Sequence, residues 1–98
     1  MSKYYKAELF NMGRLTATQG ALGLMEREDR PVNLYVYLAR HLAGDWGDMS
    51  VEDKAENEFS IDRHLRLFSA YDLPGDDRLW IITEADRSAT TLLLPADY

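Results

Sequence analysis

The sequence predicts an α+β fold, in which N-terminal helices pack on a small antiparallel β-sheet formed by the C-terminal half of the chain. Two observations support this prediction. Apolar residues recur at helical spacing up to about residue 60, whereas three β-like runs separated by turn residues follow from residue 65 onward. A length of 98 residues suffices for one core and is too short for two, so we expect residues 1–98 to form a single domain.

Residues 4–15 mix β-compatible aromatic residues with polar ones and are interrupted at Gly13. This pattern predicts one short strand or an extended arm, which can add to the sheet. Thr16 or Thr18 can cap a short first helix after it. The apolar side of this helix consists of Ala21, Leu22, Leu24 and Met25. Pro31 ends it, because the residue before a proline is disfavoured in the helical conformation.

A second helix is expected from Pro31 to about Leu42. Proline is tolerated in the first turn of a helix, and leucines recur at every fourth position between residues 34 and 42. A loop with two glycines around a tryptophan follows. Ser50 then provides an N-cap for a third helix, with Asp53 at the position where a capping box has Glu or Gln.

The three β-like runs cover residues 65–72, 78–84 and 89–94, and Pro-Gly-Asp-Asp separates the first two. This arrangement predicts an antiparallel three-stranded meander. In the middle run, Trp80, Ile82 and Glu84 alternate with Leu79, Ile81 and Thr83. Both faces of this run therefore carry bulky residues, as expected for a central strand, and we expect the helices to cover one face.

The acidic charge of the chain is concentrated in one segment. The net charge is −6, and residues 45–58 contain six acidic residues against Lys54 alone. The six are Asp45, Asp48, Glu52, Asp53, Glu56 and Glu58. Such a concentration creates a directional field that attracts a basic partner surface, while the alternative is a solvated helix face that only maintains solubility. Direct binding of nucleic acid is not expected, because the chain lacks an excess of basic residues.

Trp46 is the candidate anchor of such a binding surface. Charge accelerates encounter but adds little net affinity, so tight binding also needs a desolvated side chain, and tryptophan is among the commonest hot-spot residues. Trp46 lies between Gly44 and Gly47 in a predicted loop. The alternative is that Trp46 folds back as a plug on the core.

A catalytic alternative uses four other residues: His41, Arg66, Thr83 and Arg87. In a small metal-independent ribonuclease, histidine can exchange protons while arginine holds a phosphate. The structural alternative is that the threonine is an ordinary strand residue and that Arg87 pairs with Asp86 or Glu84 in a turn.

Neither a metal nor a cofactor is expected. A metal site needs three or more converging ligands, which His41 and His64 do not specify even with Asp45 and Asp48 nearby in sequence. The chain has no cysteine, which excludes disulfides and thiolate ligands. No apolar run approaches the ~20 residues of a membrane span, so we expect a cytoplasmic protein without a membrane partner.

Three aromatic residues near the N-terminus allow a further alternative. Tyr4, Tyr5 and Phe10 are either part of the core or an interface between two copies of the chain. A homodimeric regulator or antidote would show a self-complementary apolar patch.

Two motifs carry a resemblance to a known family. They are HLAGDWGD at residues 41–48 and WIITEADRS at residues 80–88. With them, residues 14–98 are similar to a family of small uncharacterised bacterial proteins carried on plasmids, integrative elements and phages. Small acidic proteins of such elements are enriched in inhibitors of host defence, including anti-CRISPR and antirestriction proteins. The resemblance therefore implies a non-enzymatic protein that occupies a basic surface of a host protein or ribonucleoprotein complex.

Overall fold

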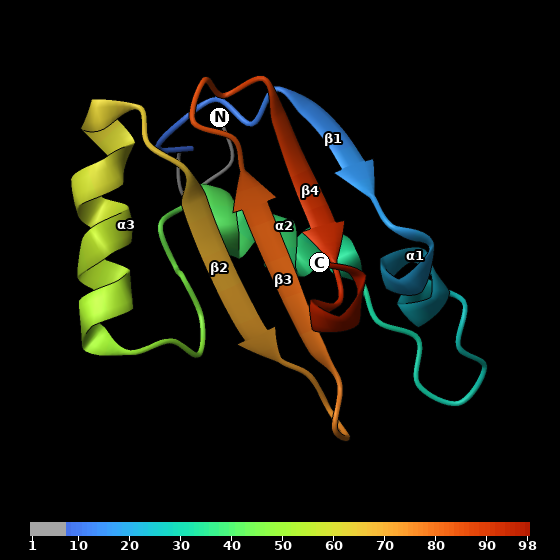
Figure 1. Cartoon of the computed structure of the whole chain (residues 1–98). Coiled ribbons are helices and arrows are strands. Elements are labelled where there is room, and N and C mark those ends of the chain that lie inside the picture. Colours follow the sequence, from blue (N-terminus) through green and yellow to red (C-terminus); the bar gives the residue numbers. More distant parts are fainter. Residues whose placement is uncertain (1–7) are drawn as a thin grey trace.

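The computed structural model describes residues 8–98 and has the predicted α+β fold (Figure 1). Its elements in chain order are β1 (Arg14–Ala17), α1 (Gln19–Met25), α2 (Leu34–Leu42), α3 (Val51–Arg63), β2 (Leu67–Asp72), β3 (Arg78–Thr83), β4 (Ala89–Leu93) and the 3-10 helix η1 (Pro95–Asp97).

The sheet has the strand order β1-β4-β3-β2. Its antiparallel pairs β2–β3 and β3–β4 confirm the predicted C-terminal meander, and β1 adds in parallel to β4. This N-terminal strand begins after Gly13, later than the sequence predicted. A Cβ atom on Gly13 would lie 2.4 Å from the Arg87 carbonyl oxygen, so the chain approaches the β3–β4 turn too closely for another residue here. Tyr4 and Tyr5 lie outside the described residues.

Side-chain caps determine where the helices begin. The Thr18 hydroxyl accepts a hydrogen bond from the Ala21 N–H (3.2 Å), and Ser50 caps α3 in the same way, as predicted. The predicted start of α2 at Pro31 is wrong. Asn33 is its N-cap and accepts a hydrogen bond from the Tyr35 N–H (3.1 Å), so α2 begins at Leu34.

The hydrophobic core lies between the sheet and the helices α1 and α2 (Figure 1). Ala21 and Leu24 of α1 and the leucines of α2 pack on one face of the sheet. The sheet contributes Tyr71, Leu79, Ile81 and Leu92 to this core, and Leu73 directly after β2 joins them. The alternation predicted for the middle strand is confirmed, because Leu79 and Ile81 are in this core and Trp80 is not.

Helix α3 lies beside β2 at the edge of the sheet (Figure 1). Its two buried residues, Asn57 and Ser60, are both polar. The Asn57 carboxamide donates to the Phe68 carbonyl oxygen (2.7 Å) and accepts from the Phe68 N–H (3.0 Å). A side chain thereby pairs with the outer edge of β2 at Phe68, and the backbone of residues 46–48 pairs with the same edge at Ala70. Together these contacts cover the edge, where a further strand would otherwise add.

Candidate functional site

The outer face of α3 contains the unpaired part of the acidic segment. Ten of the thirteen residues of α3 are exposed, so this helix is displayed to solvent rather than packed into the core. Glu52, Asp53 and Glu56 are among the exposed residues. Within residues 8–98 their carboxylates form no salt bridge, so their charge is available to a partner.

The other three acidic residues of the predicted binding segment stabilise the fold instead. The Asp45 carboxylate accepts a hydrogen bond from Arg40 (2.7 Å), which lowers the pKa of Asp45. The carboxylate of Asp48 accepts from the backbone N–H at the end of β2 (2.8 Å). Glu58 accepts a hydrogen bond from the Trp46 indole N–H (2.7 Å). These contacts tie the loop before α3 to α2 and β2.

Trp46 is not available as a docking anchor, and this prediction is wrong. Only 3% of its surface is exposed. Its indole ring stacks on Phe10 with a centroid distance of 6.2 Å and meets the His41 ring edge-on at 5.6 Å. Because these rings already desolvate Trp46, it has the other role considered from the sequence, a plug on the core.

An apolar stripe on α3 takes the place of Trp46 as candidate anchor. Val51 is 80% exposed and Phe59 is 50% exposed, with the exposed Ala55 between them in sequence. At 100° per residue these three positions form one stripe, with Glu52 and Glu56 along one side. This stripe was not predicted, although the three residues have i, i+4, i+8 spacing in the sequence.

His41 belongs to a buried hydrogen-bond network inside the core. Its ring nitrogens are hydrogen-bonded to the hydroxyls of Ser69 (2.5 Å) and Thr83 (2.9 Å). Thr83 is bonded in turn to Thr90 (2.7 Å), whose hydroxyl donates to the Met12 carbonyl oxygen (2.8 Å). Burial lowers the pKa of His41 to about 3, so the ring is neutral. The four side chains of this hydrogen-bonded network, those of His41, Ser69, Thr83 and Thr90, are fully buried, so no substrate reaches them.

Arg87 closes the C-terminal end of α3. Its guanidinium donates to the carbonyl oxygens of Ser60 (3.0 Å), Ile61 (3.1 Å) and Leu65 (2.7 Å). Within its own turn it donates to the backbone carbonyl oxygens of residues 84 and 85, not to a carboxylate, so the predicted pairing with Asp86 or Glu84 is wrong. Partial burial lowers the pKa of Arg87.

The alternative catalytic residues therefore do not form one site. His41 and Thr83 are buried together, and Arg87 is engaged by backbone carbonyls. Arg66 donates to the Tyr98 hydroxyl (2.9 Å) on the sheet face opposite α2. Among residues 8–98, no three His, Asp, Glu or Cys side chains converge in a group that could hold a metal ion.

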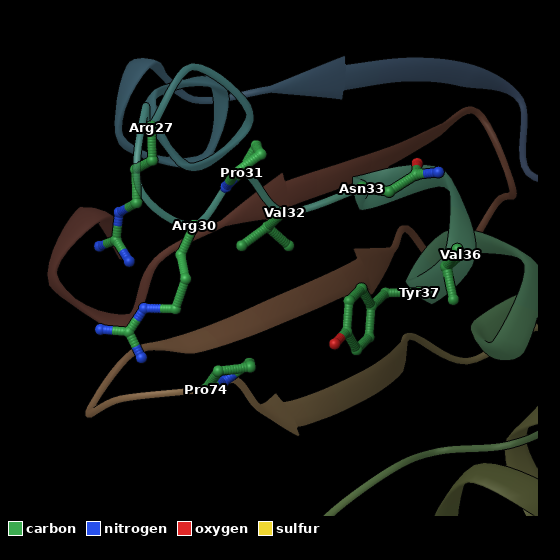
Figure 2. Close-up of a pocket in the computed structure, with 8 residues that line it drawn as sticks. All are labelled: Arg27, Arg30, Pro31, Val32, Asn33, Val36, Tyr37 and Pro74. Atoms are coloured by element: carbon green, nitrogen blue, oxygen red, sulfur yellow. The ribbon is translucent and has the colours of Figure 1, made fainter.

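A pocket of about 220 Å³ lies between the α1–α2 loop and the β2–β3 turn (Figure 2). Its lining residues are Arg27, Arg30, Pro31, Val32, Asn33, Val36, Tyr37 and Pro74. Figure 2 shows Arg27 and Arg30 on the loop side and Tyr37 on α2. Arg27 is already hydrogen-bonded to Asp77, and five acidic residues lie in these same two segments. This charge opposes an anion, so the pocket adds no catalytic or anion-binding set.

No protein-family model, curated protein or solved structure matches the chain. The family resemblance noted from the two motifs therefore stays a prediction.

Within residues 8–98, every helix is too short or too polar to cross a membrane.

Proposed function

We propose that this chain is a non-enzymatic protein-binding module that docks the outer face of α3 into a groove with a basic rim on a host protein or ribonucleoprotein complex. The observation that carries the proposal is the display of α3, which exposes both an apolar stripe and unpaired carboxylates. Neither feature is needed to hold α3 in place, since polar contacts at Asn57 and Arg87 attach it to the rest of the fold.

The apolar stripe supplies the anchor that the proposal needs. An amphipathic helix that binds in a groove presents apolar residues at i, i+4 and i+8 or similar spacing, which Val51, Ala55 and Phe59 match. Phe59 is the largest of the three and lies 3.9 Å below the guanidinium of Arg63. Burial of such a ring at the centre of an interface typically contributes more than its charged neighbours do.

The carboxylates beside the stripe determine the kind of partner. Glu52 and Glu56 give α3 an unpaired negative edge, which favours a basic surface such as one that handles nucleic acid. A protein that covers such a surface competes with the nucleic acid for it. This mode of action suits an inhibitor of a host defence complex, the role that the resemblance to proteins of mobile elements implies.

The proposal is tested with a tagged full-length chain as bait in a bacterial host, with retained proteins identified by mass spectrometry. The decisive variant combines Glu52→Lys, Glu56→Lys and Phe59→Ser, which removes the anchor and reverses the edge. A matched control combines Glu26→Lys and Glu28→Lys, which changes the charge equally on the exposed α1–α2 loop. Circular dichroism verifies that both variants are folded.

We expect a defined complex to be retained by the wild type and the loop control but not by the α3 variant. With that complex purified, affinity should fall as salt rises from about 50 to 300 mM, because screening weakens charge attraction between exposed groups. Equal retention by the folded α3 variant would contradict the proposal, as would a bait that retains no protein specifically.

A further inference from the structure

The face of the sheet opposite α1 and α2 contains an aromatic pocket. Strand alternation places Phe68 of β2 and Trp80 and Ile82 of β3 on this face, because Ser69 and Ile81 point to the helical side. The pocket has a volume of about 300 Å³ and is lined by Arg66, Phe68, Trp80, Ile82 and Tyr98.

Three rings form the walls of the pocket in fixed orientations. Phe68 and Trp80 meet edge-to-face at 5.0 Å between ring centroids, and Trp80 meets Tyr98 in the same way at 5.7 Å. Ile82 forms the floor and is 5% exposed. In contrast to a core cluster, Phe68 and Trp80 are only half-buried and Tyr98 is 71% exposed. The ring faces are therefore accessible to a further ring.

Hydrogen bonds of Asp97, the residue before Tyr98, hold the C-terminal segment in place. The Asp97 carboxylate accepts hydrogen bonds from the Thr18 hydroxyl (2.6 Å) and the Leu94 N–H (3.0 Å). The first of these bonds lowers the pKa of Asp97, so its carboxylate is charged near neutral pH. Tyr98 is thus positioned beside Trp80 before a ligand arrives, which reduces the entropy cost of binding.

The volume of the pocket limits the size of its ligand. An apolar protein cavity of about 150 Å³ holds one benzene ring. A pocket of about 300 Å³ therefore accommodates two fused rings. Its size is at the lower end of the range for ligand sites, which excludes a large cofactor.

Arg66 supplies the polar contact at the rim. Its guanidinium donates to the Tyr98 hydroxyl (2.9 Å) and forms a long ion pair with the Glu84 carboxylate at 3.9 Å, a distance too large for a hydrogen bond. Several of its five N–H groups therefore remain available, and their planar arrangement matches a carboxylate. A cationic ligand would be repelled by the same guanidinium.

We infer that this pocket is a binding site for a flat, two-ring aromatic carboxylate, whose rings pack among Phe68, Trp80 and Tyr98 while its carboxylate binds Arg66. The site lies on the open face of the sheet, is formed by residues other than those of α3, and is independent of the proposed docking surface.

The inference is tested by titrating the ¹⁵N-labelled full-length chain with 2-naphthoate and following the two indole N–H signals by NMR. The chain contains two tryptophans, and Trp80→Phe assigns their signals. We expect a saturable shift of the Trp80 signal, whereas Trp46, buried and bonded to Glu58, should not respond. The buried indole thus serves as an internal control.

Variants separate the ring contacts from the charge contact. Tyr98→Ala, on the exposed wall, should weaken 2-naphthoate binding about tenfold, within the range that aromatic contacts contribute. Arg66→Gln should weaken 2-naphthoate binding about tenfold but change binding of the uncharged 2-naphthylmethanol by less than about twofold.

Three results would overturn the inference. The first is the absence of a saturable Trp80 shift up to about 5 mM 2-naphthoate, a range that covers dissociation constants up to the low millimolar. The second is an equal response of both indole signals, which indicates a general effect on the protein. The third is an unchanged preference for the carboxylate over the alcohol in Arg66→Gln.

Discussion

The neutral, buried His41 predicts a steep loss of stability in mildly acidic solution. The unfolded chain binds a proton at His41 with a pKa near 6.5, whereas burial lowers the pKa of the folded state to about 3. Below pH 6.5 the unfolded state therefore binds more protons, and the free energy of unfolding falls with decreasing pH until the folded pKa is reached. The slope is about 1.4 kcal/mol per pH unit, which amounts to a loss of about 2 kcal/mol between pH 8 and pH 5.

Between pH 7.5 and pH 5, the change in the free energy of unfolding reports on His41 rather than on the carboxylates. Arg40 lowers the pKa of Asp45, and Thr18 lowers that of Asp97. Their stabilisation is present above the unfolded value of 3.8 and is lost as the pH falls through their lower folded values. Carboxylate protonation thus reduces stability in the same direction as His41 but mainly below pH 5.

The assay is urea unfolding followed by tryptophan fluorescence at half-unit steps of pH. His41→Gln, which has no proton to gain in this interval, should flatten the profile, while His64→Asn at the exposed end of α3 should keep it. In case His41→Gln does not fold, NMR of the wild-type imidazole gives an independent readout, because the His41 signals should not titrate above about pH 4. A flat wild-type profile, or titration of His41 near pH 6, would refute the reasoning.

Three further predictions concern stability and are measured by urea unfolding. Arg87→Ala should cost about 2–3 kcal/mol, because the last carbonyls of α3 lose their donors, and Arg87→Lys should restore only part of it. An unchanged stability would contradict this role. Gly47→Ala should cost about 2 kcal/mol or more, since its φ is +84° and a Cβ would lie 2.3 Å from a carbonyl oxygen of β2, whereas Gly23→Ala, with open space in α1, should stabilise by about 0.5–1 kcal/mol. Equal changes in stability for Gly47→Ala and Gly23→Ala would contradict the expected strain at Gly47. Asn57→Ala should cost about 1–3 kcal/mol and accelerate hydrogen exchange at Phe68, and slow exchange there would count against the edge pairing.

Local features of the fold could be predicted because they depend on neighbouring residues. Thr18 and Ser50 cap helices through hydroxyls that reach only three residues along the chain. The β-meander follows from period-two runs joined by turn residues. The start of α2 was misplaced because Pro31 and Asn33 are both acceptable near a helix start, and only the bond from Asn33 to the Tyr35 N–H decides between them.

Features of the candidate site that depend on distant contacts could not be predicted in this way. The exposure of Trp46 is decided by Phe10 and His41, which close over a loop whose glycines suggested openness. Arg87 reaches carbonyls more than twenty residues away, and no local pattern reveals this. The position of α3 at the sheet edge depends on Asn57, which pairs with the backbone of Phe68, and on Arg87, which binds carbonyls at its C-terminal end.

The residues that attach α3 to the fold are different from the residues on its exposed face. Its contacts with the body of the protein are made by Asn57, by the carbonyls that Arg87 binds and by Glu58, which accepts a hydrogen bond from Trp46, while Val51, Ala55 and Phe59 are exposed. Substitutions at exposed positions usually change stability by no more than about 0.5 kcal/mol. The outer face of α3 can therefore change in charge and shape while the scaffold keeps its stability.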